Sequence, residues 1–335
     1  MNTQVSNSFE QVRPVSRYAG WAVICMISLL MFTLPGQAQV TEGEPVSISL
    51  EEIDYPFPVA YRSFSILGRD VRMAYMDVSP QGEPNGETVV LLHGLNFFGY
   101  YWGGTAEALR SEGYRVIIPD QIGFGKSSKP IVPYSFQEHA HNTRELLREL
   151  GIRQAHIVGH SMGGMVATRF AFSYPEVSRS LVLVNMIGMR DFRLQRPFQP
   201  TQAIYESNLE RDLEQIRSGI EAYFVEWDPE YEFFVRVHHG WTLSAEWPRL
   251  AMVRALNQQM VYSQPVAYEF AHVQVPAYIL SGAEDGPNYP EMAREVLEKL
   301  PDGELHLFEN VGHNPHLESP EPFRAELIRW LERVE

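Results

Sequence analysis

The sequence predicts an α/β fold in which a mostly parallel central sheet is flanked by helices and interrupted by one helical insertion. Short apolar runs alternate with helical patterns in residues 39–188, the alternation stops in residues 189–268, and it resumes in residues 269–335. Alternating strands and helices form a parallel sheet that helices cover on both faces. Because long insertions in compact domains tend to be functional, we expect residues 189–268 to be a helical cap, or lid.

Length and composition are compatible with this architecture. A chain of 335 residues with 44% hydrophobic and 21% charged residues can hold one large α/β domain with an insertion, or two average domains. The formal net charge of −15, with no offsetting basic run, argues against a nucleic-acid partner. The single cysteine, Cys25, lies in the N-terminal segment, so the rest of the chain has no disulfide and no Cys-bound metal site.

The first 38 residues predict a secretory signal peptide. Arg13 and Arg17 precede a nearly unbroken apolar run at residues 21–34, which is shorter than the roughly 20 residues of a membrane-spanning helix. Small residues at Gly36 and Ala38 predict cleavage after Ala38. We therefore expect a periplasmic or secreted protein without a stable membrane span, the alternative being a membrane anchor through residues 21–34.

The core elements follow in order along the chain. Turn residues at 67–70 divide residues 61–77 into two short strands, and the apolar runs that follow are suited to buried parallel strands. The expected strands after this pair are 88–94, 115–120, 154–160, 179–186, 276–282 and 304–310. The expected core helices are 104–112, 136–150, a helix that follows Ser161 and runs through Ala171, 291–299 and 320–334, and the insertion is expected to hold amphipathic helices at 209–227 and 248–261.

A turn between an apolar strand and a helix places Ser161 between Gly159 and Gly163. Glycines two residues to either side of a serine permit a strained strand-to-helix turn that exposes the hydroxyl at the edge of the sheet. We therefore predict that Ser161 is a nucleophile, and a glycine-rich packing turn is the alternative.

A nucleophilic serine needs a general base that a carboxylate orients. In this type of fold the expected chain order is serine, then acid, then histidine. Asp285 follows the strand 276–282 and is the predicted acid, with Glu284 as the alternative. His313 follows the last strand and is the predicted base, with His316 as the alternative.

Two backbone N–H groups are expected to bind the oxyanion that such chemistry forms. Met162, at the start of the helix after Ser161, supplies one, and Leu95, after His93 and Gly94, supplies the other. His93 is expected to brace its loop, and His160 is expected to be a packing residue.

These segments resemble the α/β-hydrolase superfamily, in particular its capped members. The matching residues are His93-Gly94, the run from Pro119 to Pro130, Gly159 to Gly164, Asp285, and the run from Gly312 to Phe323. The resemblance implies a Ser-His-Asp hydrolase that needs no cofactor or metal, with the insertion as its lid and a structural role for the loop that contains Asp120, Gly123 and Gly125. Similar dehalogenases and epoxide hydrolases carry an aspartate in place of the serine, which argues against both.

Aromatic side chains predict an apolar substrate pocket, although many of them are expected simply to pack the insertion against the core. The candidate pocket residues are Phe97, Phe98, Trp102, Phe224 and Trp227. The sequence thus predicts an exported carboxylesterase or lipase-like enzyme whose partner is a small apolar ester with an acyl or aromatic group. The alternatives are a C–C bond hydrolase of dienone type, against which the signal peptide counts, and a non-catalytic binding protein on the same scaffold.

Overall fold

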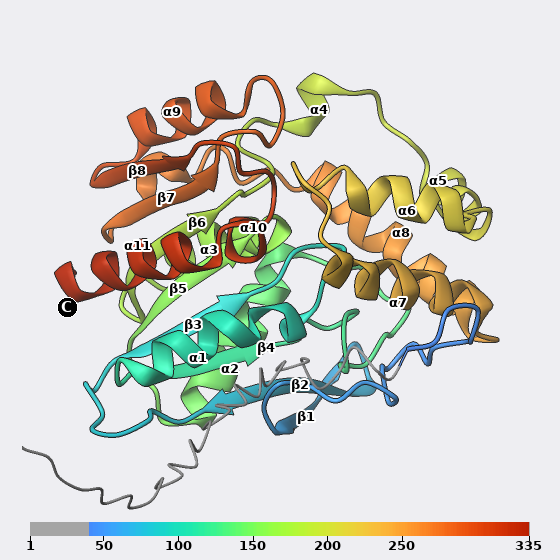
Figure 1. The fold of residues 1–335 in the computed structure, drawn as a ribbon, viewed down its shortest axis with the longest axis horizontal. Coiled ribbons are helices and arrows are strands. Elements are labelled where there is room, and N and C mark those ends of the chain that lie inside the picture. The colour runs from blue at the N-terminus through green and yellow to red at the C-terminus, as the bar shows by residue number, and fades with distance from the viewer. Residues whose placement is uncertain (1–39, 335) are drawn as a thin grey trace, which may run out of the picture. The chain divides into compact units, whose positions relative to one another are not determined.

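An eight-stranded sheet runs through residues 40–334, the part of the chain that the computed structural model describes (Figure 1). The strand order is β1-β2-β4-β3-β5-β6-β7-β8. β2 is antiparallel to both of its neighbours, and all other neighbouring pairs are parallel. The prediction of a mostly parallel sheet is therefore confirmed, whereas the predicted signal peptide lies outside the described residues.

The strands are present where the sequence predicts them, with ends that differ by one or two residues. Their bounds are β1 Val59–Ile66, β2 Arg69–Val78, β3 Thr88–Leu92, β4 Arg115–Pro119, β5 Ala155–His160, β6 Ser178–Val184, β7 Ala277–Gly282 and β8 Gly303–Phe308. Leu67 and Gly68 both have positive φ angles, 48° and 73°. Two successive positive φ angles match the right-handed twist of antiparallel strands, which accounts for the tight β1–β2 hairpin.

Helices cover both faces of the sheet, as expected. On one face lie α1 (Gly103–Ser111) and α11 (Pro320–Arg333), and on the other lie α2 (Phe136–Glu149), α3 (Met162–Ser173) and α9 (Tyr289–Lys299) (Figure 1). Each face carries its own cluster of buried apolar side chains. Since β3, β5 and β7 lie between the two clusters, all of their residues are buried.

Between β6 and β7 the chain forms the inserted helices, which gather at one end of the sheet (Figure 1). They are α4 Phe192–Gln195, α5 Thr201–Leu209, α6 Leu213–Glu221, α7 Glu232–Leu243 and α8 Trp247–Ser263. The prediction of one helix over 209–227 was wrong in its bounds. The Asp212 carboxylate accepts a hydrogen bond from the N–H of Gln215, whose side chain binds the Asp212 N–H, and this capping box makes α6 begin at Leu213.

The short elements are η2 Gly99–Trp102, η3 Pro229–Tyr231, η4 Phe270–His272 and α10 Pro315–Glu318. Among residues 40–334, no helix combines the length and the apolar character that crossing a membrane requires. The loops after β3, β5, β7 and β8 leave the same edge of the sheet, because these strands are parallel. In open α/β sheets, ligands bind outside this carboxyl edge, so the predicted site residues are placed at the edge where a site is expected.

Candidate active site

The turn at Ser161 has a backbone conformation that few non-glycine residues adopt. Its φ and ψ angles are 56° and −120°, and strain of this kind persists only where the surroundings enforce it. The Ser161 N–H donates a hydrogen bond of 3.0 Å to the Val184 carbonyl. A Cβ atom on Gly159 would lie 2.2 Å from the Gly163 carbonyl oxygen, and one on Gly163 would lie 2.3 Å from that of Leu92. The two glycines are therefore required by close packing of backbone around the serine.

The loops after β7 and β8 bring Asp285 and His313 together. His313 Nδ1 donates a hydrogen bond of 2.7 Å to Asp285 Oδ2. Because a carboxylate only accepts, Nδ1 carries the proton and Nε2 of the neutral ring is left as an acceptor. Asn185 Nδ2 donates a second hydrogen bond of 3.0 Å to the same carboxylate oxygen. Asn185 thus holds Asp285 in place, a role that was not predicted from the sequence.

The alternative base, His316, lies in a different environment. Its ring is 2% exposed and stacks on Trp102 with ring centroids 4.3 Å apart. Within residues 40–334, neither of its ring nitrogens has a hydrogen-bond partner. Burial lowers the pKa of His316 well below its usual value. Of the two candidate histidines, His313 is therefore the one that is bonded to a carboxylate, and the acid it contacts is Asp285 and not Glu284.

A chain of hydrogen bonds joins the three loops of the site through His160. The Gly94 N–H donates to the Tyr101 hydroxyl oxygen at 2.9 Å, and the Tyr101 hydroxyl lies 2.8 Å from His160 Nδ1. His160 Nε2 lies 2.8 Å from the His313 carbonyl oxygen. A carbonyl only accepts, so Nε2 donates and Nδ1 accepts the Tyr101 proton. Burial lowers the pKa of His160 well below its usual value, and the neutral ring therefore ties the loops together in addition to packing between them.

The predicted oxyanion donors flank the serine. A Cβ atom on Gly94 would lie 3.0 Å from Ser161 Cβ and 3.4 Å from Ser161 Oγ, so the loop before Leu95 passes directly against the nucleophile candidate. Met162 follows Ser161 as the first residue of α3. Among the hydrogen bonds of the described chain, none uses the N–H of Leu95 or Met162 as donor. Both groups are thus available to a ligand oxygen.

His93 and Asp120 hold the loops behind the site. His93 Nε2 accepts a hydrogen bond of 3.0 Å from the Gln121 N–H. Asp120 accepts hydrogen bonds from the N–H groups of Gly99 and Lys126, both at 2.7 Å. These contacts are to backbone, which agrees with the structural roles expected for His93 and for the Asp120 loop.

The inserted helices reach the site through Asn96, the residue after Leu95. Asn96 Nδ2 donates to the Tyr223 hydroxyl at 2.5 Å, and Asn96 Oδ1 accepts from Arg254 Nη2 at 2.7 Å. His238 Nε2 lies 2.9 Å from the Asn96 carbonyl oxygen, to which it donates. The Tyr223 ring in turn stacks on His313 with centroids 4.9 Å apart, and its carbonyl accepts the His313 N–H at 3.0 Å. None of these contacts was predicted from the sequence.

The structure separates the aromatic residues that were predicted to line a pocket. Phe97 lies nearest the site, with its ring 6.1 Å from that of His160. Phe98 and Trp102 are buried, and Trp102 packs against His316. Phe224 stacks on Tyr231 at 3.9 Å within the insertion. Trp227 is 36% exposed and packs against Phe224. Of the five, Phe97 and Trp102 both lie against the ring of His160, the residue before Ser161, at centroid distances of 6.1 and 6.3 Å.

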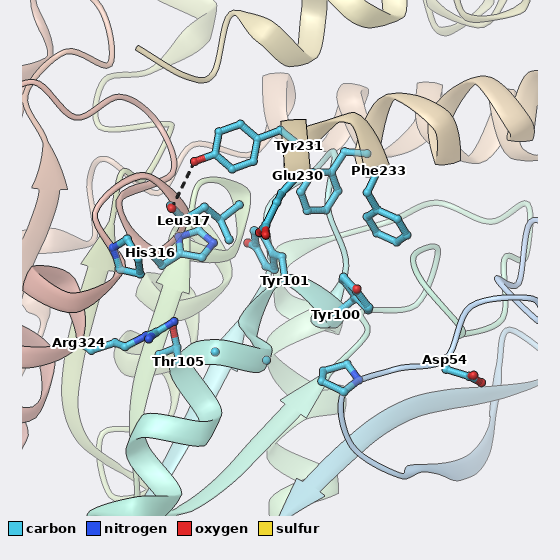
Figure 2. A pocket seen from close by; sticks show the side chains of 15 residues that line it. Asp54, Tyr100, Tyr101, Thr105, Glu230, Tyr231, Phe233, His316, Leu317 and Arg324 are labelled. Atoms are coloured by element: carbon cyan, nitrogen blue, oxygen red, sulfur yellow. Dashed lines mark hydrogen bonds between the residues drawn. The ribbon is translucent and has the colours of Figure 1, made fainter. Parts of the chain in front are cut away.

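A cavity of about 200 Å³ lies between the start of α1, the inserted helices and α10 (Figure 2). Its walls include Tyr101, Phe233 and His316, and they do not include Ser161, Asp285 or His313. Tyr101 and His316 both contact the His160 ring, at centroid distances of 5.6 and 4.9 Å. The cavity therefore lies behind the layer of side chains that supports the site, not at the serine itself.

Comparisons with known proteins agree with this geometry. The sequence model of the alpha/beta hydrolase family matches residues 89–326. The crystal structure of a probable hydrolytic enzyme from Pseudomonas aeruginosa has 36% sequence identity, covers 86% of this chain and 99% of that chain, and superposes with a TM-score of 0.83. A 2-hydroxy-6-oxononadienedioate/2-hydroxy-6-oxononatrienedioate hydrolase of Paraburkholderia phymatum is 28% identical over 79% of this chain and 92% of its own length. Lipase 1 of Psychrobacter immobilis is 26% identical over 88% of this chain and 92% of its own length.

Proposed function

We propose, from the premise that this chain belongs to the alpha/beta hydrolase family, that it hydrolyses carboxylic esters with Ser161 as nucleophile, His313 as base and Asp285 as the orienting acid. The observation that carries the proposal is the 2.7 Å hydrogen bond between His313 and Asp285, made by two loops at the edge where Ser161 also lies. A strained serine, a histidine and a carboxylate in these roles are the parts that acyl transfer requires.

The reaction follows from these groups. The Ser161 hydroxyl attacks the ester carbonyl while His313 Nε2 accepts its proton, and the Leu95 and Met162 N–H groups bind the oxyanion. His313 then returns the proton to the leaving alcohol, and the acyl group stays on Ser161. Water, activated by His313, releases the acid and restores the serine. Asp285 keeps the proton on Nδ1 and stabilises the imidazolium in both steps.

The inserted helices serve as the lid in this proposal, and the enzyme acts outside the cytoplasm. Hydrogen bonds from Arg254 and His238 to Asn96 support a lid that closes against the oxyanion loop. The apolar run and the small residues before position 39 support export with cleavage after Ala38.

Ester hydrolysis by Ser161→Ala tests the proposal. We expect the wild type to hydrolyse p-nitrophenyl esters and the variant to lose about 10⁴-fold or more in kcat. Retained turnover in the variant contradicts the proposed role of Ser161. A wild type that hydrolyses none of these esters supports the alternative that the protein is a non-catalytic binding protein.

C–C bond hydrolysis is the second candidate, because the relative from Paraburkholderia phymatum is named for such a reaction. The same residues would serve it, since a serine hydrolase can release a carbon leaving group as well as an alkoxide. Turnover of vinylogous 1,5-diketone acids faster than that of simple esters would favour this candidate.

A further inference from the structure

Two arginines of the insertion, Arg211 and Arg254, lie within electrostatic range of each other and form no ion pair with a carboxylate of the described chain. Arg254, on α8, is 8% exposed, and Arg211, between α5 and α6, is partly buried. Burial lowers the pKa of Arg254 to about 9, and the neighbouring charge of Arg211 lowers it as well. Burying a charge without a counter-charge is costly, so an unpaired pair of cations in the insertion calls for an explanation.

The hydrogen-bond partner that Arg254 has in the described chain is a neutral group. Its Nη2 donates to Asn96 Oδ1 at 2.7 Å, while its Nε is buried and, within residues 40–334, has no hydrogen-bond partner. His238 is a further neighbour. Burial lowers the pKa of His238 well below its usual value, and the charges of Arg254 and Arg211 lower it further. Burial raises the pKa of Tyr223, while the charges of both arginines oppose that rise. The cluster thus holds two cations, a neutral histidine and a phenol, with guanidinium hydrogen-bonding capacity left unused.

Arg254 is connected to the proposed reaction centre through Asn96 and Tyr223. Asn96, which binds Arg254, directly follows Leu95, the proposed oxyanion donor. Tyr223, which binds Asn96, stacks on the ring of His313. A group held by Arg211 and Arg254 would therefore lie within one or two side chains of the ester that Ser161 attacks. The chain as a whole carries a formal charge of −15, so this positive site is local and not part of a generally cationic surface.

We infer that Arg254 and Arg211 bind a carboxylate of the substrate. The enzyme would then act on monoesters of dicarboxylic acids, in which one carboxyl group is esterified and the other is free. The inference rests on the proposed function for the reaction, but its binding step is independent of turnover. The guanidinium fork matches a carboxylate with two parallel hydrogen bonds, and a substrate carboxylate would supply the counter-charge that the chain lacks. The expected substrate is then an ester with an apolar body and an anionic end.

A matched pair of substrates tests the inference. Phenyl hydrogen adipate and phenyl hexanoate have the same leaving group and acyl length, and only the first carries a carboxylate. We expect wild-type kcat/KM to favour the adipate hemiester by about tenfold or more. Arg254→Gln and Arg211→Gln should each lose most of that preference through KM, so that kcat/KM falls further for the hemiester than for the hexanoate. Arg254→Lys should retain part of it, because the charge remains without the fork.

Arg249→Gln is the matched control, because Arg249 lies on the same helix but its side chain is 52% exposed and faces Glu246. It should keep the preference for the hemiester. An equal loss for both substrates in Arg254→Gln and Arg211→Gln would assign the arginines a merely structural role and overturn the inference, as would a wild type without preference.

Binding separates this inference from the proposed function. Calorimetry with Ser161→Ala, which retains the lid, should show the hemiester bound about tenfold or more tightly than the neutral ester, and Arg254→Gln in that background should abolish the difference. Equal affinity for the two esters overturns the inference whatever the activity. A wild type that binds the hemiester selectively but cleaves neither ester overturns the proposed function alone.

Discussion

The carboxyl edge of the sheet and the inserted helices contribute to the site in different ways. At the sheet edge the carboxylate has hydrogen-bond donors from the chain itself: Asp285 receives hydrogen bonds from His313 and Asn185, and His160 uses both ring nitrogens. In the insertion, the guanidinium groups of Arg211 and Arg254 have no carboxylate partner among the described residues. The carboxylate at the sheet edge is thus paired within the chain, whereas the two guanidinium groups of the insertion leave room for an anionic ligand. In our two proposals, the sheet edge carries out the chemistry and the insertion selects the substrate.

The largest effect is expected from Asp285→Asn at the sheet edge. An amide cannot stabilise the imidazolium of His313 by charge, and it does not enforce the Nδ1–H tautomer. We expect kcat on a neutral ester to fall about 10³- to 10⁴-fold with KM little changed. Glu284→Gln is the control, because Glu284 is the exposed neighbour and makes no such contact. A loss of less than about tenfold in kcat would show that Asp285 is not the acid that orients His313.

Glycine substitutions test the two regions for stability. A Cβ atom at Gly163 would lie 2.3 Å from the Leu92 carbonyl oxygen, in a backbone contact that cannot relax without moving β3. Urea unfolding should therefore show Gly163→Ala destabilised by about 3 kcal/mol or more. Gly219 lies inside α6, and its Cβ would meet only the tip of Arg211 at 3.4 Å. Gly219→Ala should instead stabilise the protein by about 0.5–1 kcal/mol. Equal effects at the two positions would contradict the difference in packing.

A smaller effect is expected from Tyr101→Phe, which removes the hydroxyl between Gly94 and His160. The unpaired N–H and ring nitrogen should cost about 1–2 kcal/mol and loosen the oxyanion loop, lowering kcat about tenfold with KM within about twofold. Tyr134→Phe removes another buried hydroxyl, which donates to the Pro130 carbonyl away from the site. It should cost stability while leaving kcat unchanged, and a similar loss of kcat in both variants would assign Tyr101 no positioning role.

The parts of the site that the sequence predicted are those with a local cause. Gly159 and Gly163 flank Ser161 because a Cβ at either position would collide with backbone, and such a constraint appears as a short motif. Asp285 and His313 each follow a strand, so parallel topology alone places their loops at one edge. Asn185 also follows a strand, β6, so the same topological argument places it at this edge beside Asp285.

The remaining contacts have no local signal. Asn96 meets Tyr223 and Arg254 across 127 and 158 positions of the chain, and that meeting depends on how the insertion packs on the core. α7 (Glu232–Leu243) was not predicted, although Glu232, Arg236 and His239 recur at helical spacing on its less buried side. Burial of charge likewise becomes visible only in the folded chain, so the unpaired state of Arg254 could not be inferred from its position in the sequence.

Covalent trapping tests the central claim most directly. The folded wild-type protein is treated with a fluorophosphonate, digested and examined by mass spectrometry. The proposed function predicts one adduct, on Ser161, that is lost in Ser161→Ala and strongly slowed in Asp285→Asn. No adduct on the folded protein, or an adduct on another serine that persists in Ser161→Ala, would contradict it.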